Sequence, residues 1–206
     1  YATTNDFGTP NGSPYLGSSV WAFDRTAMLA GNATATMVRF RQNNGANDFY
    51  YSGTVGLEGT TTSSQNGLFI YPSGGGNINI FELTPNFANP PASIIGAVTA
   101  IPVAAYAAPP GSVAQQGSGT QIETLQQRMM FKMNYRNRSG TESIVATHTV
   151  GVSGLAAVRW YELRRVAGGW PFCQQGTLAN PDGNSRLLGS FSMAANGRLA
   201  FSYALS

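Results

Sequence analysis

Apolar and polar side chains alternate with a period of two in several segments, and this alternation constrains the fold more than any other feature. Between residues 128 and 136 the apolar positions are Met129, Phe131, Met133 and Tyr135, with Met130 as the one exception. Near the end of the chain they are Leu199, Phe201, Tyr203 and Leu205. Successive side chains of a β-strand point to opposite faces of a sheet, so the pattern predicts strands with one buried face.

The composition agrees with an all-β fold and excludes a helical bundle. Of the 206 residues, 42 % are hydrophobic, which is enough for a core, and only 10 % are charged. Much of the remainder is Gly, Asn, Ser and Thr, which favour turns and strands over helices. We expect one short helical turn, capped at its start by Asp24 and ended by Gly31 in the left-handed conformation.

Turn residues divide the alternating segments into hairpins. We expect strands at residues 15–23, 35–41, 67–71, 77–83, 129–137, 142–150, 155–165, 170–178, 187–193 and 199–205. The run Ile94, Ile95, Val98 and Ile101 predicts a buried strand followed by a proline-rich loop, because prolines interrupt the only stretch apolar enough for a membrane helix. The last strand needs a partner, either an earlier strand or another chain, since an exposed regular edge invites aggregation.

Six strings of the chain are distinctive: those of residues 21–31, 130–137, 142–150, 158–164, 174–177 and 188–203, the last reading Leu-Gly-Ser-Phe-Ser-Met-Ala-Ala-Asn-Gly-Arg-Leu-Ala-Phe-Ser-Tyr. In these strings the chain resembles a family of large secreted bacterial proteins of unknown function with propeller-like, sialidase-like β repeats. The resemblance implies a β-propeller-type fold and a secreted or cell-surface location. It implies no catalytic residues, and the Asp-box string Ser-x-Asp-x-Gly-x-x-Trp of sialidases is absent.

On this interpretation residues 1–206 form a single propeller-like unit of four-stranded antiparallel meanders. The approximate blades are residues 1–66, 67–120 and 121–186, and residues 187–206 begin a further blade. Three blades are too few, because a propeller ring normally closes with about four to eight. We therefore expect an incomplete ring that another copy or another protein chain completes. The chain opens at Tyr1 without an initiator Met, and we expect it to be a processed form or a piece of a larger protein.

The residues that usually carry chemistry are sparse. The single Cys and single His cannot form a disulfide framework or a Cys/His zinc site. We expect His148 to be a buried, hydrogen-bonded imidazole, and Cys173 to be a small buried residue unless it bonds a partner chain. No motif places any pair of the nine Asp and Glu residues for catalysis. Calcium is conceivable at the turns 43–48 and 180–184, although neither has a known calcium spacing, so no cofactor is predicted.

Four residues are candidates for ligand or interface contacts: Trp170, Tyr161, Arg128 and Arg136. Exposed aromatic rings could stack on the sugars of a glycan. Seven basic residues lie between Arg128 and Arg165 against two acidic ones, but the segment has no nucleic-acid-binding motif, which favours a solvated strand face. The sequons at Asn11, Asn32 and Asn137 are common by chance.

These observations favour a non-catalytic extracellular binding or assembly protein of propeller type, acting in a cell-surface or secreted complex. Two alternatives remain open at this stage. One is a sialidase-like glycoside hydrolase, and the other is a structural subunit whose open sheets are completed by neighbouring chains.

Overall fold

The computed structural model describes residues 1–9, 12, 14–43, 53–57, 66–126, 128–130 and 133–206. Its strands are β1 (Ala2–Phe7), β2 (Tyr15–Phe23), β3 (Met37–Asn43), β4 (Gly53–Leu57), β5 (Gly67–Pro72), β6 (Asn77–Thr84), β7 (Ile94–Ile95), β8 (Thr99–Pro102), β9 (Ser112–Gln115), β10 (Ser118–Glu123), β11 (Met133–Arg138), β12 (Thr141–Val152), β13 (Leu155–Arg164), β14 (Phe172–Leu178), β15 (Arg186–Met193) and β16 (Leu199–Leu205). The described helices are α1 (Arg25–Leu29) and the 3₁₀ turn η1 (Pro90–Ala92). The all-β expectation is confirmed, and no described helix is long and apolar enough to cross a bilayer.

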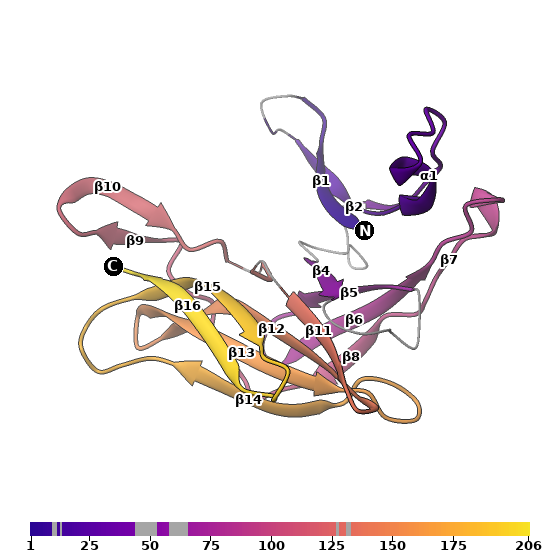
Figure 1. Ribbon diagram of the computed structural model, residues 1–206. Helices are drawn as coiled ribbons and strands as arrows, with labels where there is room; N and C mark the ends of the chain where they lie inside the picture. The colour runs from indigo at the N-terminus through magenta and orange to yellow at the C-terminus, as the bar shows by residue number, and fades with distance from the viewer. Residues whose placement is uncertain (10–11, 13, 44–52, 58–65, 127, 131–132) are drawn as a thin grey trace.

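The strands form one large sheet and three small ones. The large sheet has the order β14-β13-β12-β11-β4-β5-β6-β7, and β8 also pairs with β6. The small sheets are β1-β2-β3 and the hairpins β9–β10 and β15–β16. Every described pairing between strands is antiparallel except that of β11 with β4. None of the described sheets closes on itself (Figure 1).

The arrangement differs from separate four-stranded blades. The meander β11-β12-β13-β14 was expected and is present, but its first strand continues through the parallel β11–β4 pair into β5 and β6. Residues expected in two blades, 67–120 and 121–186, therefore share one sheet. Neither a blade boundary between them nor a propeller ring is seen among the described strands.

The local signals in the sequence are largely confirmed. The Asp24 side chain accepts a hydrogen bond from the backbone of Ala27 at 3.0 Å, and Gly31 has φ 71°. The turns at Ser139-Gly140 and Ser153-Gly154 have positive φ at both residues, the conformation that matches the twist of antiparallel strands in a tight hairpin.

The apolar run of Ile94, Ile95, Val98 and Ile101 was predicted wrongly as one buried strand. It forms two short strands, β7 and β8, on the edge of β6. Ile101 is buried, whereas Ile94 and Val98 are exposed. Both strands lie along the edge of β6 (Figure 1), and Ile101 is buried because its side chain joins the core cluster with Ile78 and Ile80, whereas Ile94 and Val98 belong to no core cluster of the described residues.

Both faces of β5 are buried, and this organises the core. Leu68 and Ile70 point to one cluster, which includes residues of β6, β11, β12 and β13: Ile78, Ile80, Met133, Tyr135, Ile144, Tyr161 and Leu163. Phe69 and Tyr71 point to a second cluster with Val20, Ala22, Val38, Phe81 and Leu83. The sheet β1-β2-β3 thus covers one face of β5 and β6, and the remainder of the large sheet curls over the other.

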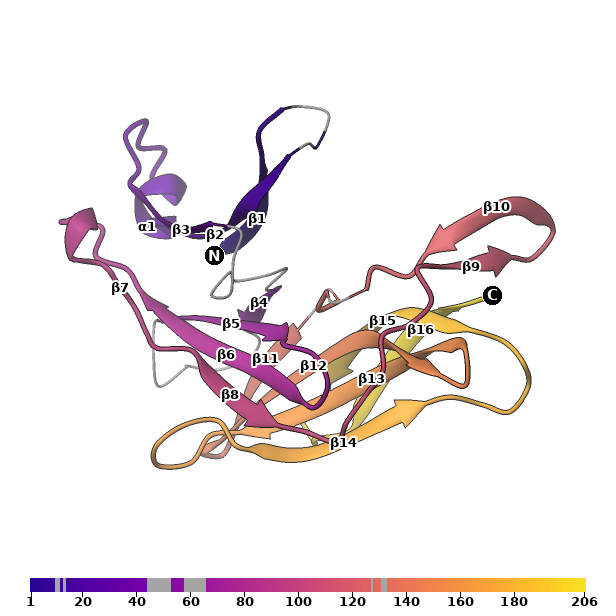
Figure 2. The same ribbon diagram turned by 180° about the vertical axis from the view of Figure 1, so that it is seen from behind.

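The curl brings the two ends of the large sheet together. Just after β8, the Ala104 backbone N–H donates to Oε1 of Gln175 on β14 at 3.1 Å, and the Arg159 guanidinium donates to the Ala104 carbonyl at 3.2 Å. Arg159 also donates to Thr177 and Gln175. Seen from behind, β8 and β14 lie near each other although they are far apart in the strand order (Figure 2).

The hairpin β15–β16 forms a further layer over β11, β12 and β13. Phe191 and Met193 are buried against Val145, and Trp160 stacks on Phe191 with ring centroids 5.7 Å apart. Gly189 allows the close approach, because a Cβ there would lie 2.7 Å from Val158 Cγ1. At the edge, Arg136 Nε donates to the Met193 carbonyl at 2.7 Å.

The dependence of the fold on β5 can be tested with a matched pair of isoleucines. Ile70→Ala removes a fully buried side chain and should lower the free energy of unfolding by about 2–5 kcal/mol. Ile94→Ala, at a side chain that is 64 % exposed, should change it by no more than about 0.5 kcal/mol. Urea denaturation followed by intrinsic fluorescence measures both, and equal losses would contradict the described core.

Candidate functional site

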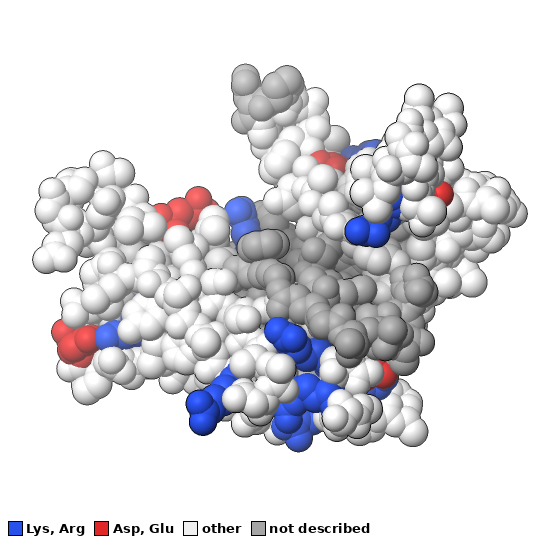
Figure 3. All heavy atoms as spheres, viewed as in Figure 1, with Lys and Arg blue, Asp and Glu red and all other residues white. Residues whose placement is uncertain are grey.

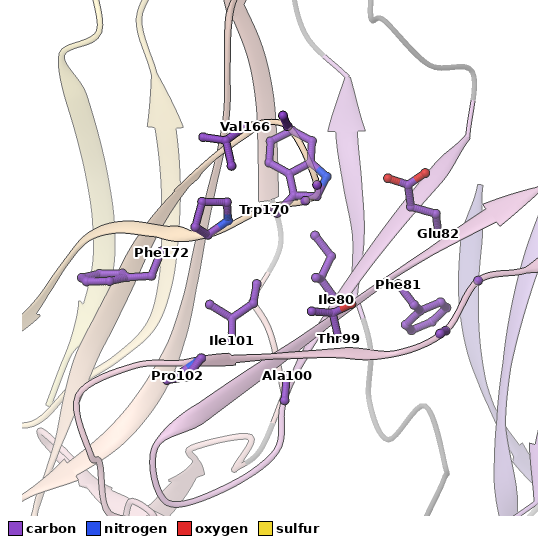
Figure 4. A pocket seen from close by; sticks show the side chains of 16 residues that line it. Ile80, Phe81, Glu82, Thr99, Ala100, Ile101, Pro102, Val166, Trp170 and Phe172 are labelled. Atoms are coloured by element: carbon purple, nitrogen blue, oxygen red, sulfur yellow. The ribbon is translucent and has the colours of Figure 1, made fainter.

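A groove lies where the curled sheet remains open between β8 and the segment that leads into β14. We call it the β8–β14 groove, and its volume is about 600 Å³. Sixteen residues line it, among them Ile80, Ile101, Pro102, Val166, Trp170 and Phe172 (Figure 4). The lining is mainly apolar and the volume suits a small ligand or a few residues of a peptide.

The sequence creates one wall of this groove by a tight reversal after β13. The backbones of Val166 and Gly169 exchange hydrogen bonds of 3.1 and 3.2 Å, and Gly168 and Gly169 have φ of 98° and 151°. Other residues rarely adopt such positive φ values. The reversal returns the chain to the sheet, so Trp170 turns inward just before β14 begins.

Trp170 carries the main polar group of the groove. Its side chain is only 6 % exposed and packs edge-on against Tyr135 with a centroid distance of 6.2 Å. The Arg165 guanidinium lies over the indole, 4.8 Å from the ring centroid. Within the described part of the chain the buried indole Nε1 has no hydrogen-bond partner. A buried N–H without an acceptor costs free energy, so a ligand acceptor at this atom would be stabilised.

The charges near the groove are paired with one another. Glu82 is the single charged residue of the lining, and it contacts Arg165 at 3.0 Å. Glu142 lies 3.3 Å from the same guanidinium, and Asn66 donates to the second oxygen of Glu82 at 3.0 Å. The groove therefore offers an apolar floor and no unpaired charge among its described lining residues, which favours an uncharged ligand over an ionic one.

The four residues predicted as contacts do not form one site. Trp170 lines the groove. Tyr161 is fully buried in the core, and Arg136 bonds the β15 backbone. Arg128 is half-buried just before the bridge between Met129 and His148. Their roles as ligand or interface contacts stay predictions, and Trp170 is the one whose surroundings suit a ligand.

His148 lies in the core, as expected. Its Nε2 is 2.8 Å from the Tyr161 hydroxyl, and the imidazole ring stacks on the Tyr161 ring. The Tyr106 ring meets the imidazole edge-on, with the two ring centroids 4.8 Å apart. Burial, with a smaller contribution from the charge of Arg159, lowers the pKa of His148 to about 3. The imidazole is therefore neutral at physiological pH and serves as a hydrogen-bonding part of the core.

The carboxylates of the described residues are mostly held by arginines. Asp182 binds Arg186 and also accepts from the Asn184 backbone, which fits its predicted role in a turn. The Arg186 guanidinium keeps the pKa of Asp182 below its usual value. Glu162 binds Arg164, at 2.9 Å, and the Ser143 hydroxyl. No carboxylate pair is singled out for catalysis by these contacts.

The described residues also bear on the metal and thiol expectations. They contain no group of three or more His, Cys, Asp or Glu side chains placed to hold a metal ion. Most of the turn 43–48 and the sequon at Asn11 lie outside the described residues.

Cys173 is exposed, so the prediction of a buried side chain is wrong. It lies on β14, an outer strand whose pairing is with β13 alone among the described strands.

The groove itself was not predicted, because its walls come from distant parts of the sequence. The neighbouring Gly168 and Gly169, followed by Trp170, mark a reversal that turns an aromatic ring inward, and this was the one local signal. No protein-family model matches the chain, and no curated protein or solved structure is significantly similar to it. The geometry of the groove and of the open sheet edges therefore carries the functional argument.

The buried imidazole makes stability depend on pH. An unfolded chain protonates His148 near pH 6.5, whereas the folded chain resists protonation down to about pH 3. The unfolded state therefore binds more protons between these values, and the free energy of unfolding should fall on acidification by up to about 1.4 kcal/mol per pH unit. His148→Gln should flatten this dependence between pH 6.5 and 4.5.

Chemical denaturation at several pH values measures the slope. Asp6 and Glu162, whose pKa values are lowered by neighbouring hydrogen bonds and arginines against the opposing effect of burial, contribute equally in the wild type and the variant, so the difference between the two slopes reports His148. An unchanged slope in the variant would show that His148 is not the group responsible.

Proposed function

We propose that this protein is a non-catalytic binding and assembly protein that takes an extended segment of another protein chain into the β8–β14 groove. The observation that carries the proposal is the open edge of β8, which borders an apolar groove opposite the reversal 166–171 and the start of β14. Among the described strands, β8 pairs with β6 alone and β14 with β13 alone. Open strand edges are templates for an added strand.

The groove supplies the complementary features that strand addition needs. Backbone groups along β8 and β14 can pair with an incoming strand, and alternate side chains of that strand would enter the apolar floor around Ile101 and Phe172. The indole N–H of Trp170 is buried in the groove wall without a partner among the described residues, so a shift of that wall on binding would give it an acceptor in a backbone carbonyl of the same segment. An uncharged, extended peptide of small apolar residues meets all three conditions.

The wider setting of this function is also part of the proposal. Action at the cell surface or in a secreted complex, and membership of the propeller-like secreted family, rest on the sequence strings alone. The open edges favour the variant in which the chain is a structural subunit completed by its neighbours. The hydrolase alternative gains no support from the described carboxylates, each of which has a structural role where its contacts are known.

Selection of peptides from a displayed library of random 12-residue sequences tests the proposal. Peptides with alternating apolar side chains should be enriched, and Phe172→Lys should weaken their binding by about tenfold or more, because it places a charge at the groove entrance. Phe23→Lys is the matched control: Phe23 is 38 % exposed and Phe172 is 37 % exposed, but Phe23 lies on β2. The Phe23→Lys variant should bind the selected peptides as tightly as the wild type does.

Hydrogen exchange on the complex gives a second readout. Backbone amides of residues 99–101 and 172–175 should become protected when a selected peptide binds. Failure to enrich any peptide, equal binding by both variants, or protection elsewhere would each overturn the groove as the binding site.

A further inference from the structure

β16 is an edge strand without the residues that usually prevent an edge from pairing. It pairs with β15 alone among the described strands, and residues 199–205 contain neither a charged residue nor a proline. Phe201, Tyr203 and Leu205 are 41 %, 38 % and 57 % exposed. Charges and prolines are the usual means of keeping an edge strand from pairing. Their absence indicates that this edge pairs with something.

The sequence of β16 is nearly the same in both directions: Leu-Ala-Phe-Ser-Tyr-Ala-Leu. Two antiparallel copies centred on Ser202 would therefore place Leu199 opposite Leu205, Ala opposite Ala, and Phe201 opposite Tyr203. Every side chain then meets one of its own kind, or another aromatic ring. Aromatic and aliphatic cross-strand pairs are stabilising.

The backbone of the hairpin permits this same register. Ser185 and Ser206 exchange two backbone hydrogen bonds, of 3.2 and 3.1 Å, so Ser206 faces β15. Hydrogen-bonding direction alternates along a strand, and the backbone groups of the odd residues from 199 to 205 consequently face away from β15. Pairing about Ser202 brings Phe201 opposite Tyr203 with both sets of groups facing each other, as a hydrogen-bonded pair requires.

The side chains around the edge also suit a second copy. Phe191 stacks on Phe201 at 5.6 Å, and Phe201 contacts Tyr203 at 6.3 Å, forming an aromatic row that a twofold mate would extend. The charged residues beside the strand are Arg186, which is paired with Asp182 and lies 5.7 Å from the centroid of the Tyr203 ring, and Arg198 at the other end. The surface over β15 and β16 is accordingly almost free of charged atoms (Figure 3).

We propose that two copies of this chain associate through antiparallel pairing of β16 with β16 about a twofold axis at Ser202. The result is a continuous four-stranded sheet made of the two hairpins. Such an interface is isologous and closes at a dimer. Both β16 edges are then paired, and no further copy can add to the sheet at this strand. The interface is separate from the β8–β14 groove, and its tests do not depend on peptide binding.

Disulfide trapping tests the register. In a Cys173→Ser background, Ser202→Cys places the two introduced thiols opposite each other at a non-hydrogen-bonded pair, where Cα atoms are about 4.5 Å apart. Mild oxidation should give a covalent dimer. Ala200→Cys is the matched control on the same face of β16, because its two thiols would lie about 13 Å apart. It should not cross-link, and equal cross-linking by both variants would overturn the register.

Introducing a charge at the twofold axis gives an independent test of the dimer. Ser202 is exposed, so Ser202→Lys and Ser202→Glu should each fold, yet each should weaken dimerisation by about tenfold or more, since like charges meet across the axis. An equimolar mixture should restore the dimer. Light scattering coupled to gel filtration should give twice the 21.7 kDa of one chain for the wild type and for the mixture. A monomeric wild type, or variants that dimerise as well alone as when mixed, would refute the proposal.

Discussion

The burial of both faces of β5 is the constraint on which the other features of this structure depend. Its alternate side chains serve two cores, with Phe69 and Tyr71 against the sheet β1-β2-β3 and Leu68 and Ile70 against β11, β12 and β13. A flat sheet could not bring β5 against strands of its own sheet, so the large sheet must curl. The curl in turn brings β8 toward β14 without joining them. The open groove is thus a geometric result of how the hydrophobic core is filled.

The sequence predicted what depends on neighbouring residues. Hairpins joined by Ser-Gly turns, the Asp24 cap and the alternation that buries Tyr135 could all be found locally. The parallel pairing of β11 with β4 could not, because it joins strands about 80 residues apart and no turn specifies it. The prediction of which side chains are exposed failed at some positions for the same reason. Ile94 and Cys173 have apolar or small side chains, but their strands lie at sheet margins that only the tertiary arrangement defines. Trp170 was recognised as a candidate, while the opposite wall of its groove was not.

The protein treats its open edges in different ways, and the contrast supports a division of roles. At the edge of the small N-terminal sheet, Arg39 and Arg41 of β3 are charged and partly exposed, and both contact Asp6 of β1. Charges of this kind discourage the addition of a further strand. β16 has no such protection. We assign partners to two edges that lack charged residues, a second copy at β16 and an extended segment at the β8–β14 groove.

Arg159 joins the two sides of the curled sheet at one end of the β8–β14 groove. Its guanidinium holds the Ala104 carbonyl, Thr177 and Gln175 together, and so ties the end of β8 to the middle of β14. The side chain is almost completely buried, and breaking this tie would leave a charge in the interior without its acceptors. If a peptide binds in the groove as we propose, these contacts mark the end of the space open to it, beyond Pro102. The position of Arg159 would then limit the length of chain that the groove accepts.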